Sequence, residues 1–348
     1  MKVIIVTVSS PFVRGGAEIH AESLRDALRT EGHDAEIVAI PFKWYPPERI
    51  HDQMLSCRLL DLTESDGIEI DRVIGLKFPA YFVSHPNKVL WILHQHRPAY
   101  DLWDHPLGDL HRFPNGSDVR EAIRLADQRL IPEAKAVYAN SLNVSRRLKS
   151  YCSIDSTPLY HPPRNADQFY CAEAYDYLFF PSRLSPIKRQ RLVLEALART
   201  YHPVRVCFAS SANHSSYAQE VVRLAHDLDL EERAVFLGEI SEEEKQAWFA
   251  HARGVVYPPV DEDYGYVTLE SMLSAKPVIT CTDSGGPLEF IQDHETGLIV
   301  EPSAEAVAAA MDELWEKPAA AEALGRSGRA YYDSFEITWP NAVARLLA

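Results

Sequence analysis

Two glutamates separated by seven residues stand where carboxylates could bind hydroxyl groups. Glu262 lies in an acidic turn, and Glu270 lies in the first turn of a helix expected over about residues 267–274. The N–H groups that open a helix have no partner within it and carry the positive end of its dipole, so they favour an anion such as phosphate. Gly265, between the two acids, permits a close backbone approach. A carboxylate on each side of a phosphate site suits a molecule with hydroxyl groups on both sides of a diphosphate, as in a sugar nucleotide.

Two cations follow the strand expected over residues 177–180. Arg183 and Lys188 bracket the turn after it. An arginine offers a two-pronged fork and a lysine a point charge, so the pair could grip one diphosphate from two sides. Each feature also has a plainer explanation, since a basic turn is usually a solvated face and Glu270 could simply complement the helix dipole.

The sequence around the two glutamates is similar to a known signature. Residues 262–279 read E-D-Y-G-Y-V-T-L-E-S-M-L-S-A-K-P-V-I. This stretch resembles the Glu-x7-Glu signature of the retaining glycosyltransferases of family four, with Tyr264, Ser271 and Ala275 where the family has Phe, Ala and Gly. The following T-D-S-G-G-P-L-E-F-I resembles the second glycine turn of the family.

The cationic turn is also similar to the family pattern G-R-L-x-x-x-K-G. Both cations are kept, with Ser182 in place of the first glycine and Arg189 in place of the last. These two departures weaken the match of the backbone while keeping the match of the charges.

The resemblance implies a fold and an activity. The fold would be the α/β fold called GT-B, with two Rossmann-like, doubly wound domains that face one another across a cleft. The activity would be that of a metal-independent, retaining hexosyltransferase, which moves a sugar from a UDP- or GDP-sugar such as GDP-mannose to a hydroxyl of a sugar or lipid-linked glycan, in polysaccharide or glycan biosynthesis. No cofactor is expected, because the nucleotide sugar is a substrate.

The resemblance also implies roles for individual residues. Arg183 and Lys188 would stabilise the leaving diphosphate, Glu262 would hold donor sugar hydroxyls, and Glu270 would hold the ribose. A histidine after the strand over residues 89–93 would approach the sugar or the acceptor, with His94 the first choice and His96 the second. The residues expected to bind the donor are Gly15, Gly16, Gly238, Gly265, Tyr266, Val267, Thr268, Glu270, Gly285 and Gly286.

The length of 348 residues exceeds the size at which a single core usually stops growing, so two domains are expected. The proline-rich stretch 158–163 fits a linker between an acceptor-side domain over 1–160 and a donor domain over 164–332. The final helix, within 333–348, is expected to pack back on the first domain, as it does in the GT-B fold.

Charge and cysteine content exclude several classes of protein. The net charge of −15 argues against a nucleic-acid partner, which needs a basic face. The five scattered cysteines show no zinc spacing and are expected to be reduced thiols in a cytoplasmic protein, with peripheral contact at the inner face of the membrane left open. Asp261 and Asp263 match the D-x-D pattern of metal-dependent glycosyltransferases, but so short a pattern is common by chance, and no metal site is expected.

Two other classes of function remain open from the sequence. One is a sugar-nucleotide epimerase or a phosphorylase that shares the two-domain plan. The other is a subunit that binds a nucleotide sugar without catalysis.

Overall fold

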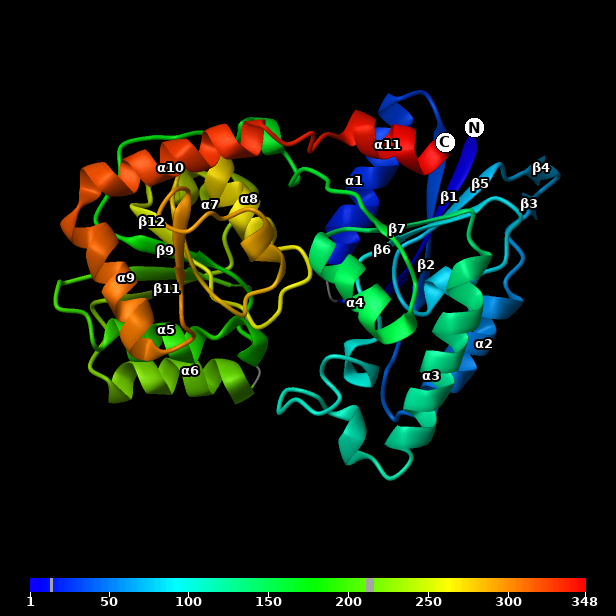
Figure 1. The fold of residues 1–348 in the computed structure, drawn as a ribbon, viewed down its shortest axis with the longest axis horizontal. Helices are drawn as coiled ribbons and strands as arrows, with labels where there is room; N and C mark the ends of the chain where they lie inside the picture. The colour runs from blue at the N-terminus through cyan, green and yellow to red at the C-terminus, as the bar shows by residue number, and fades with distance from the viewer. Residues whose placement is uncertain (13–14, 211–215) are drawn as a thin grey trace. The chain divides into compact units, whose positions relative to one another are not determined.

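The chain forms two α/β units (Figure 1). The computed structural model describes residues 1–12, 15–210 and 216–348. Unit 1 consists of Met1–Arg164 and Ile337–Ala348, and unit 2 of Asn165–Glu336. Each unit contains a six-stranded parallel sheet, with the orders β2-β1-β5-β6-β7-β8 in unit 1 and β11-β10-β9-β12-β13-β14 in unit 2.

The sheet of unit 1 is built from short apolar strands with helices between them. Its strands are β1 (Lys2–Ser9), β2 (Asp34–Pro41), β5 (Arg72–Gly75), β6 (Lys88–Ile92), β7 (Ala136–Ala139) and β8 (Thr157–Pro158), with a separate hairpin of β3 (Glu64–Ser65) and β4 (Ile68–Glu69). Its helices are α1 (Gly16–Thr30), α2 (Arg49–Leu59), α3 (Gly116–Leu130), α4 (Leu142–Cys152) and α11 (Trp339–Leu347). Short 3-10 turns are η1 (Ala80–Phe82), η2 (Arg97–Ala99), η3 (Leu110–Arg112) and η4 (Ile131–Glu133).

Unit 2 repeats this plan. Its strands are β9 (Leu178–Pro181), β10 (Val206–Ala209), β11 (Ala234–Gly238), β12 (Gly254–Val256), β13 (Val278–Cys281) and β14 (Gly297–Val300). Its helices are α5 (Gln190–Leu197), α6 (Ser216–Asp227), α7 (Glu242–His251), α8 (Tyr266–Leu273), α9 (Ala304–Glu316) and α10 (Pro318–Asp333). Its 3-10 turns are η5 (Ala166–Gln168), η6 (Pro186–Lys188) and η7 (Gly286–Glu289).

The first strand shows why the sheet of unit 1 is covered on both faces. Successive side chains of a strand point to opposite faces, so a strand that is apolar throughout needs a core on each side. Val3 and Ile5 of β1 belong to one core cluster, which also contains residues of α1 and α11. Ile4 and Val6 belong to the other, which contains residues of α2, α3 and α4.

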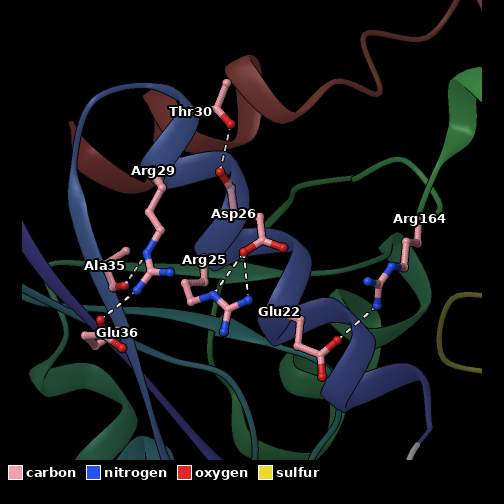
Figure 2. A network of polar contacts seen from close by, with 8 residues as sticks. All are labelled: Glu22, Arg25, Asp26, Arg29, Thr30, Ala35, Glu36 and Arg164. Carbon is pink, nitrogen blue, oxygen red and sulfur yellow. Dashed lines mark hydrogen bonds and ion pairs between the residues drawn. The ribbon is translucent and has the colours of Figure 1, made fainter.

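Helix α1 is tied to its neighbours by exposed and partly buried polar contacts, shown in Figure 2. Arg29 donates to the backbone oxygen of Ala35 at 3.0 Å and pairs with Glu36 on β2 at 2.6 Å. Arg164, at the end of the first segment of unit 1, pairs with Glu22 at 3.0 Å. Ion pairs this open to solvent each contribute about 0–1 kcal/mol, so they orient the helix more than they stabilise it.

The segment expected to be a linker packs against unit 1. Residues 161–163 are buried, and the indole N–H of Trp91 donates to the backbone oxygen of Leu159 at 3.0 Å. Unit 1 therefore continues to Arg164, beyond the expected limit at 160. The chain returns from unit 2 to unit 1 after Glu336. Just before this point, the Phe335 ring packs 5.7 Å from the Phe290 ring, so residues 333–336 belong to unit 2 and not, as expected, to the first domain.

Candidate functional site

The strand order of unit 2 brings three functional loops together. From β9 the chain adds β10 and β11 on one side, and then returns to place β12 and β13 on the other. Ligands of doubly wound sheets bind outside the carboxyl ends of the strands at this reversal. The loops after β9, β12 and β13 carry, in that order, Lys188, Glu262 and the Gly285–Gly286 turn.

The two glycine turns of the signature pack tightly on each other. Gly265, the N-cap of α8, has φ +88°, and a Cβ added there would lie 2.9 Å from Cγ of Pro287. A Cβ on Gly286 would lie 2.7 Å from the backbone oxygen of Tyr264. Both positions need glycine, because any side chain would force the turns apart. Gly285 also has a positive φ, +70°.

Glu262 is fixed by this pairing of loops. It forms an isolated parallel bridge with Gly285, and its backbone N–H donates to Ser284 at 2.9 Å. Its carboxylate forms an ion pair with the Lys188 ammonium, which also donates to the Tyr257 hydroxyl at 2.9 Å. Burial, and then the Glu262 carboxylate, raise the pKa of Tyr257 well above its usual value, so this phenol stays protonated. The structure thus brings together the predicted Lys188 and Glu262.

Glu270 lies in α8 and is almost enclosed. Its side chain is 9% exposed, and its Oε1 accepts a hydrogen bond from the Lys245 ammonium at 2.9 Å. Lys245, on α7, also pairs with Glu242 at 2.8 Å. Burial alone would lower the pKa of Lys245, but the two carboxylates outweigh burial and raise it. The sequence did not single out this lysine, because its contact with Glu270 spans 25 positions and follows no recognisable motif.

Arg183 does not join these groups. It is exposed, and its backbone oxygen accepts a hydrogen bond from Gln190 at 2.9 Å, but its side chain pairs with no residue that the structure describes. Arg189 makes a two-pronged contact with Asp283, with one N···O distance of 2.6 Å. From the sequence, this arginine was noted only as a replacement of the last glycine in the family pattern. Arg189 has φ +59°, which explains why glycine suits this position.

The remaining predicted donor residues of unit 2 lie at strand and helix ends. Tyr266, Val267 and Thr268 form the first turn of α8, and the hydroxyl of Thr268 is buried without a hydrogen-bond partner among the described residues. Gly238 ends β11 with φ +74°.

The predicted residues of unit 1 follow β1 and β6. Gly15 is the N-cap of α1, where its N–H donates to the Glu18 carboxylate at 2.9 Å, and Gly16 begins the helix. His94 is half-buried, with Nδ1 2.6 Å from the backbone oxygen of Gln95. His96 is buried 5.2 Å from the Phe78 ring, and burial lowers its pKa to about 3. Its surroundings are those of a core residue.

Three further observations concern metals, membranes and open grooves. Over residues 1–12, 15–210 and 216–348, no three His, Cys, Asp or Glu side chains cluster in a way that could hold a metal ion. In the same part of the chain, no helix is both long and apolar enough to cross a bilayer. A groove of about 720 Å³ between α10 and residues 292–296 contains none of the predicted site residues.

Comparison with known sequences finds a family and its relatives. Residues 166–331 match the family model described as "Glycosyl transferases group 1". The alpha-1,3/1,6-mannosyltransferase ALG2 of Dictyostelium discoideum is 34% identical over 113 residues, which are 32% of this chain and 27% of that protein. The match therefore spans about a quarter of the relative's length.

Comparison with solved structures covers nearly the whole chain. Sucrose-phosphate synthase (tll1590) from Thermosynechococcus elongatus has a TM-score of 0.74 at 17% identity, over 99% of this chain and 97% of that one. Anabaena Alr3699/HepE in complex with UDP-glucose has a TM-score of 0.70 at 17% identity, over 99% and 98%. Likeness at this identity shows the fold, and it confirms the expected α/β fold. The chain therefore has the GT-B fold and is similar, over residues 166–331, to the glycosyl transferases of group 1.

Proposed function

We propose that this protein is a retaining glycosyltransferase that moves a hexose-type sugar from a UDP- or GDP-sugar to a hydroxyl of a sugar or lipid-linked glycan. The observation that carries this proposal is the joining of Lys188 and Glu262 at the strand-order reversal of unit 2. Reversal points of doubly wound sheets bind nucleotides, and the start of α8 suits a phosphate.

Charge stabilisation of the leaving diphosphate is the main task in this reaction. Lys188 is held between a phenol and a carboxylate, so its ammonium is positioned before the donor binds. Preorganised charge of this kind needs no rearrangement as the glycosidic bond breaks. The N–H groups that open α8 would add hydrogen bonds to the phosphate oxygens, as would the Thr268 hydroxyl, which has no partner in the described part of the chain.

The two signature glutamates would then recognise opposite ends of the donor. Glu262, paired with Lys188, would hold sugar hydroxyls and is not assigned as a nucleophile. Glu270, with one oxygen on Lys245, would hold the ribose hydroxyls. Arg183 is exposed and keeps its expected role at the diphosphate only as a prediction.

The proposal requires no metal ion, because Lys188 and the helix amides would supply the positive charge. It also keeps Gly15, Gly16 and His94 as predicted residues of unit 1. A cytoplasmic location is carried forward from the cysteine content, with peripheral contact at the inner face of the membrane left open.

The test is a panel of UDP- and GDP-hexoses, each with a panel of sugar acceptors. Mass spectrometry should detect a product with one added hexose, proton NMR should show the anomeric configuration of the donor retained, and excess EDTA should leave the rate unchanged. Epimerised donor formed without acceptor, turnover that requires free phosphate, or donor binding with no turnover would each contradict the proposal.

A further inference from the structure

Lys245 is a charged residue of unit 2 that the family signature does not include. It lies in the first half of α7, and its ammonium bridges two carboxylates, Glu270 at 2.9 Å and Glu242 at 2.8 Å. The ammonium also lies 5.9 Å from the centre of the Phe169 ring, which covers it with an apolar face. The Lys245 side chain is 20% exposed, so this is a partly enclosed contact and not a surface pair.

The partner that matters is Glu270. A carboxylate that is only 9% exposed would be costly to keep ionised without a compensating charge. Lys245 supplies that charge from a separate helix, since α7 and α8 are linked by β12 and a loop. The contact therefore places a compensating charge beside the Glu270 carboxylate and fixes its direction.

The contact uses only one of the two carboxylate oxygens. Oε1 accepts the hydrogen bond from Lys245, while Oε2 accepts none from any residue within the described part of the chain. A carboxylate held by one oxygen leaves the other as an acceptor in a fixed place, and hydrogen bonds to an ionised acceptor are the strong ones.

We propose that Lys245 is a positioning residue, which orients Glu270 so that its second oxygen accepts from the hydroxyls of the donor's ribose and makes the site selective for ribonucleotides over 2′-deoxyribonucleotides. The inference rests on the proposed function, because it takes a nucleotide as the ligand. Glu242, which is 48% exposed, shares the ammonium but lies on the solvent side and is not assigned to the ligand.

The experiment measures binding and needs no acceptor. Calorimetry gives the dissociation constants of UDP, GDP, 2′-deoxy-UDP and 2′-deoxy-GDP for the wild type, Lys245→Met and Lys245→Arg. Lys317→Met is the matched control, because Lys317 is an exposed lysine of unit 2 whose side chain has no partner among the described residues. Thermal unfolding checks that each variant is folded.

We expect the wild type to prefer one ribonucleotide over its 2′-deoxy form by about tenfold or more, as for a hydrogen bond to a charged group. Lys245→Met should reduce that preference to below about threefold by weakening the ribonucleotide alone, and Lys245→Arg should restore most of it. An unchanged preference in Lys245→Met, or equal weakening of both nucleotides, would overturn the positioning role.

A second comparison is needed because Lys245→Met leaves the buried Glu270 carboxylate without its cation, which could itself disturb the site. Glu270→Gln and Lys245→Met/Glu270→Gln contain no such charge, and they should show the same, reduced preference for ribose, since Lys245 acts through Glu270. A further loss in the double variant would overturn the inference. If the wild type binds none of the four nucleotides, the proposed function itself fails. If the wild type binds UDP or GDP and Lys245→Met binds them equally well, the proposed function stands and only the positioning role of Lys245 fails.

Discussion

A lysine held between a phenol and a carboxylate has a defined position before any substrate binds. Lys188 is in this situation, with Tyr257 on one side and Glu262 on the other. Its side chain is only 12% exposed, so competition from water is small. The neighbouring arginine differs, because Arg183 is exposed. At the scale of single residues, the sequence therefore identified two cations, Arg183 and Lys188. In the structure, only Lys188 is held in place by neighbouring side chains.

His20 shows a second kind of buried group, which bears on the pH dependence of stability. It is 1% exposed among Trp91, His161 and Trp339, and neither ring nitrogen has a partner among the described residues. Burial, and then His161, lower the pKa of His20 well below its usual value. Below about pH 6.5, His20 is therefore protonated in the unfolded chain but stays neutral in the folded protein.

We predict that stability is lost as the pH falls below about 6.5, and that His20→Phe removes part of this loss. Between pH 7.5 and 5.0 the wild type should lose about 2 kcal/mol more than His20→Phe, from one histidine that is neutral in the folded state. Urea unfolding at both pH values measures this, with the exposed His51→Phe as the control. If the two variants lose the same stability on acidification, His20 does not contribute.

Ala275 occupies a position where the related signature has glycine, and the structure gives the reason. It follows α8 with φ +51°, a left-handed conformation that costs a residue with a Cβ about 1–2 kcal/mol. We predict that Ala275→Gly stabilises unit 2 by about 0.5–1 kcal/mol, measured by thermal unfolding. The control Ala309→Gly, at an exposed position inside α9, should be destabilised by about 1 kcal/mol. Loss of stability in Ala275→Gly would show that the backbone strain is not there.

At the scale of elements, the site depends on loops that belong to neighbouring strands. The side chain of Arg189, after β9, reaches Asp283, after β13, and lies 3.5 Å from the backbone oxygens of Pro258 and Pro259, after β12. This one side chain of the loop after β9 therefore contacts the other two loops that carry the candidate site. This contact follows from the strand order β9-β12-β13 and could not be read from the spacing of 94 residues between the two charges.

We predict that Arg189 and Asp283 act as a unit. Arg189→Met and Asp283→Asn should each destabilise unit 2 by about 1 kcal/mol, and the double variant should lose no more than either single variant. Urea unfolding of the four proteins completes the cycle. Additive losses would mean that the two charges are independent and that the loops are held by other contacts.

Most of the elements could be predicted from hydrophobic periodicity, because buried parallel strands are short apolar runs and the helices between them are amphipathic. The α8 helix, for example, was expected over about 267–274 and spans Tyr266–Leu273. Helix α2 was missed, since it buries only Ile50 and Cys57 and so has almost no apolar periodicity. Lys245 and Arg189 were missed as site residues because their partners are distant in sequence.

At the scale of the whole molecule, two features of the architecture could not be predicted from local sequence patterns. The C-terminal helix α11 belongs to unit 1, where the Arg72 guanidinium donates to the backbone oxygens of Leu346 and Leu347, at 3.0 and 3.1 Å. Only the resemblance to a known fold predicted that the final helix packs back on the first domain. The units themselves were foreseeable from length, but their limits depended on buried packing at residues 161–163 and at Phe335.

The central claim is that unit 2 binds an activated sugar through Lys188 and Glu270. The most direct measurement is the thermal unfolding of the wild type, Lys188→Ala, Glu270→Ala and Lys317→Met against UDP- and GDP-sugars. At a hundredfold excess over the dissociation constant, a true donor should stabilise the wild type and Lys317→Met by about 2.7 kcal/mol, and the other two variants much less. No stabilisation by any donor, or equal stabilisation of all four proteins, would contradict the claim.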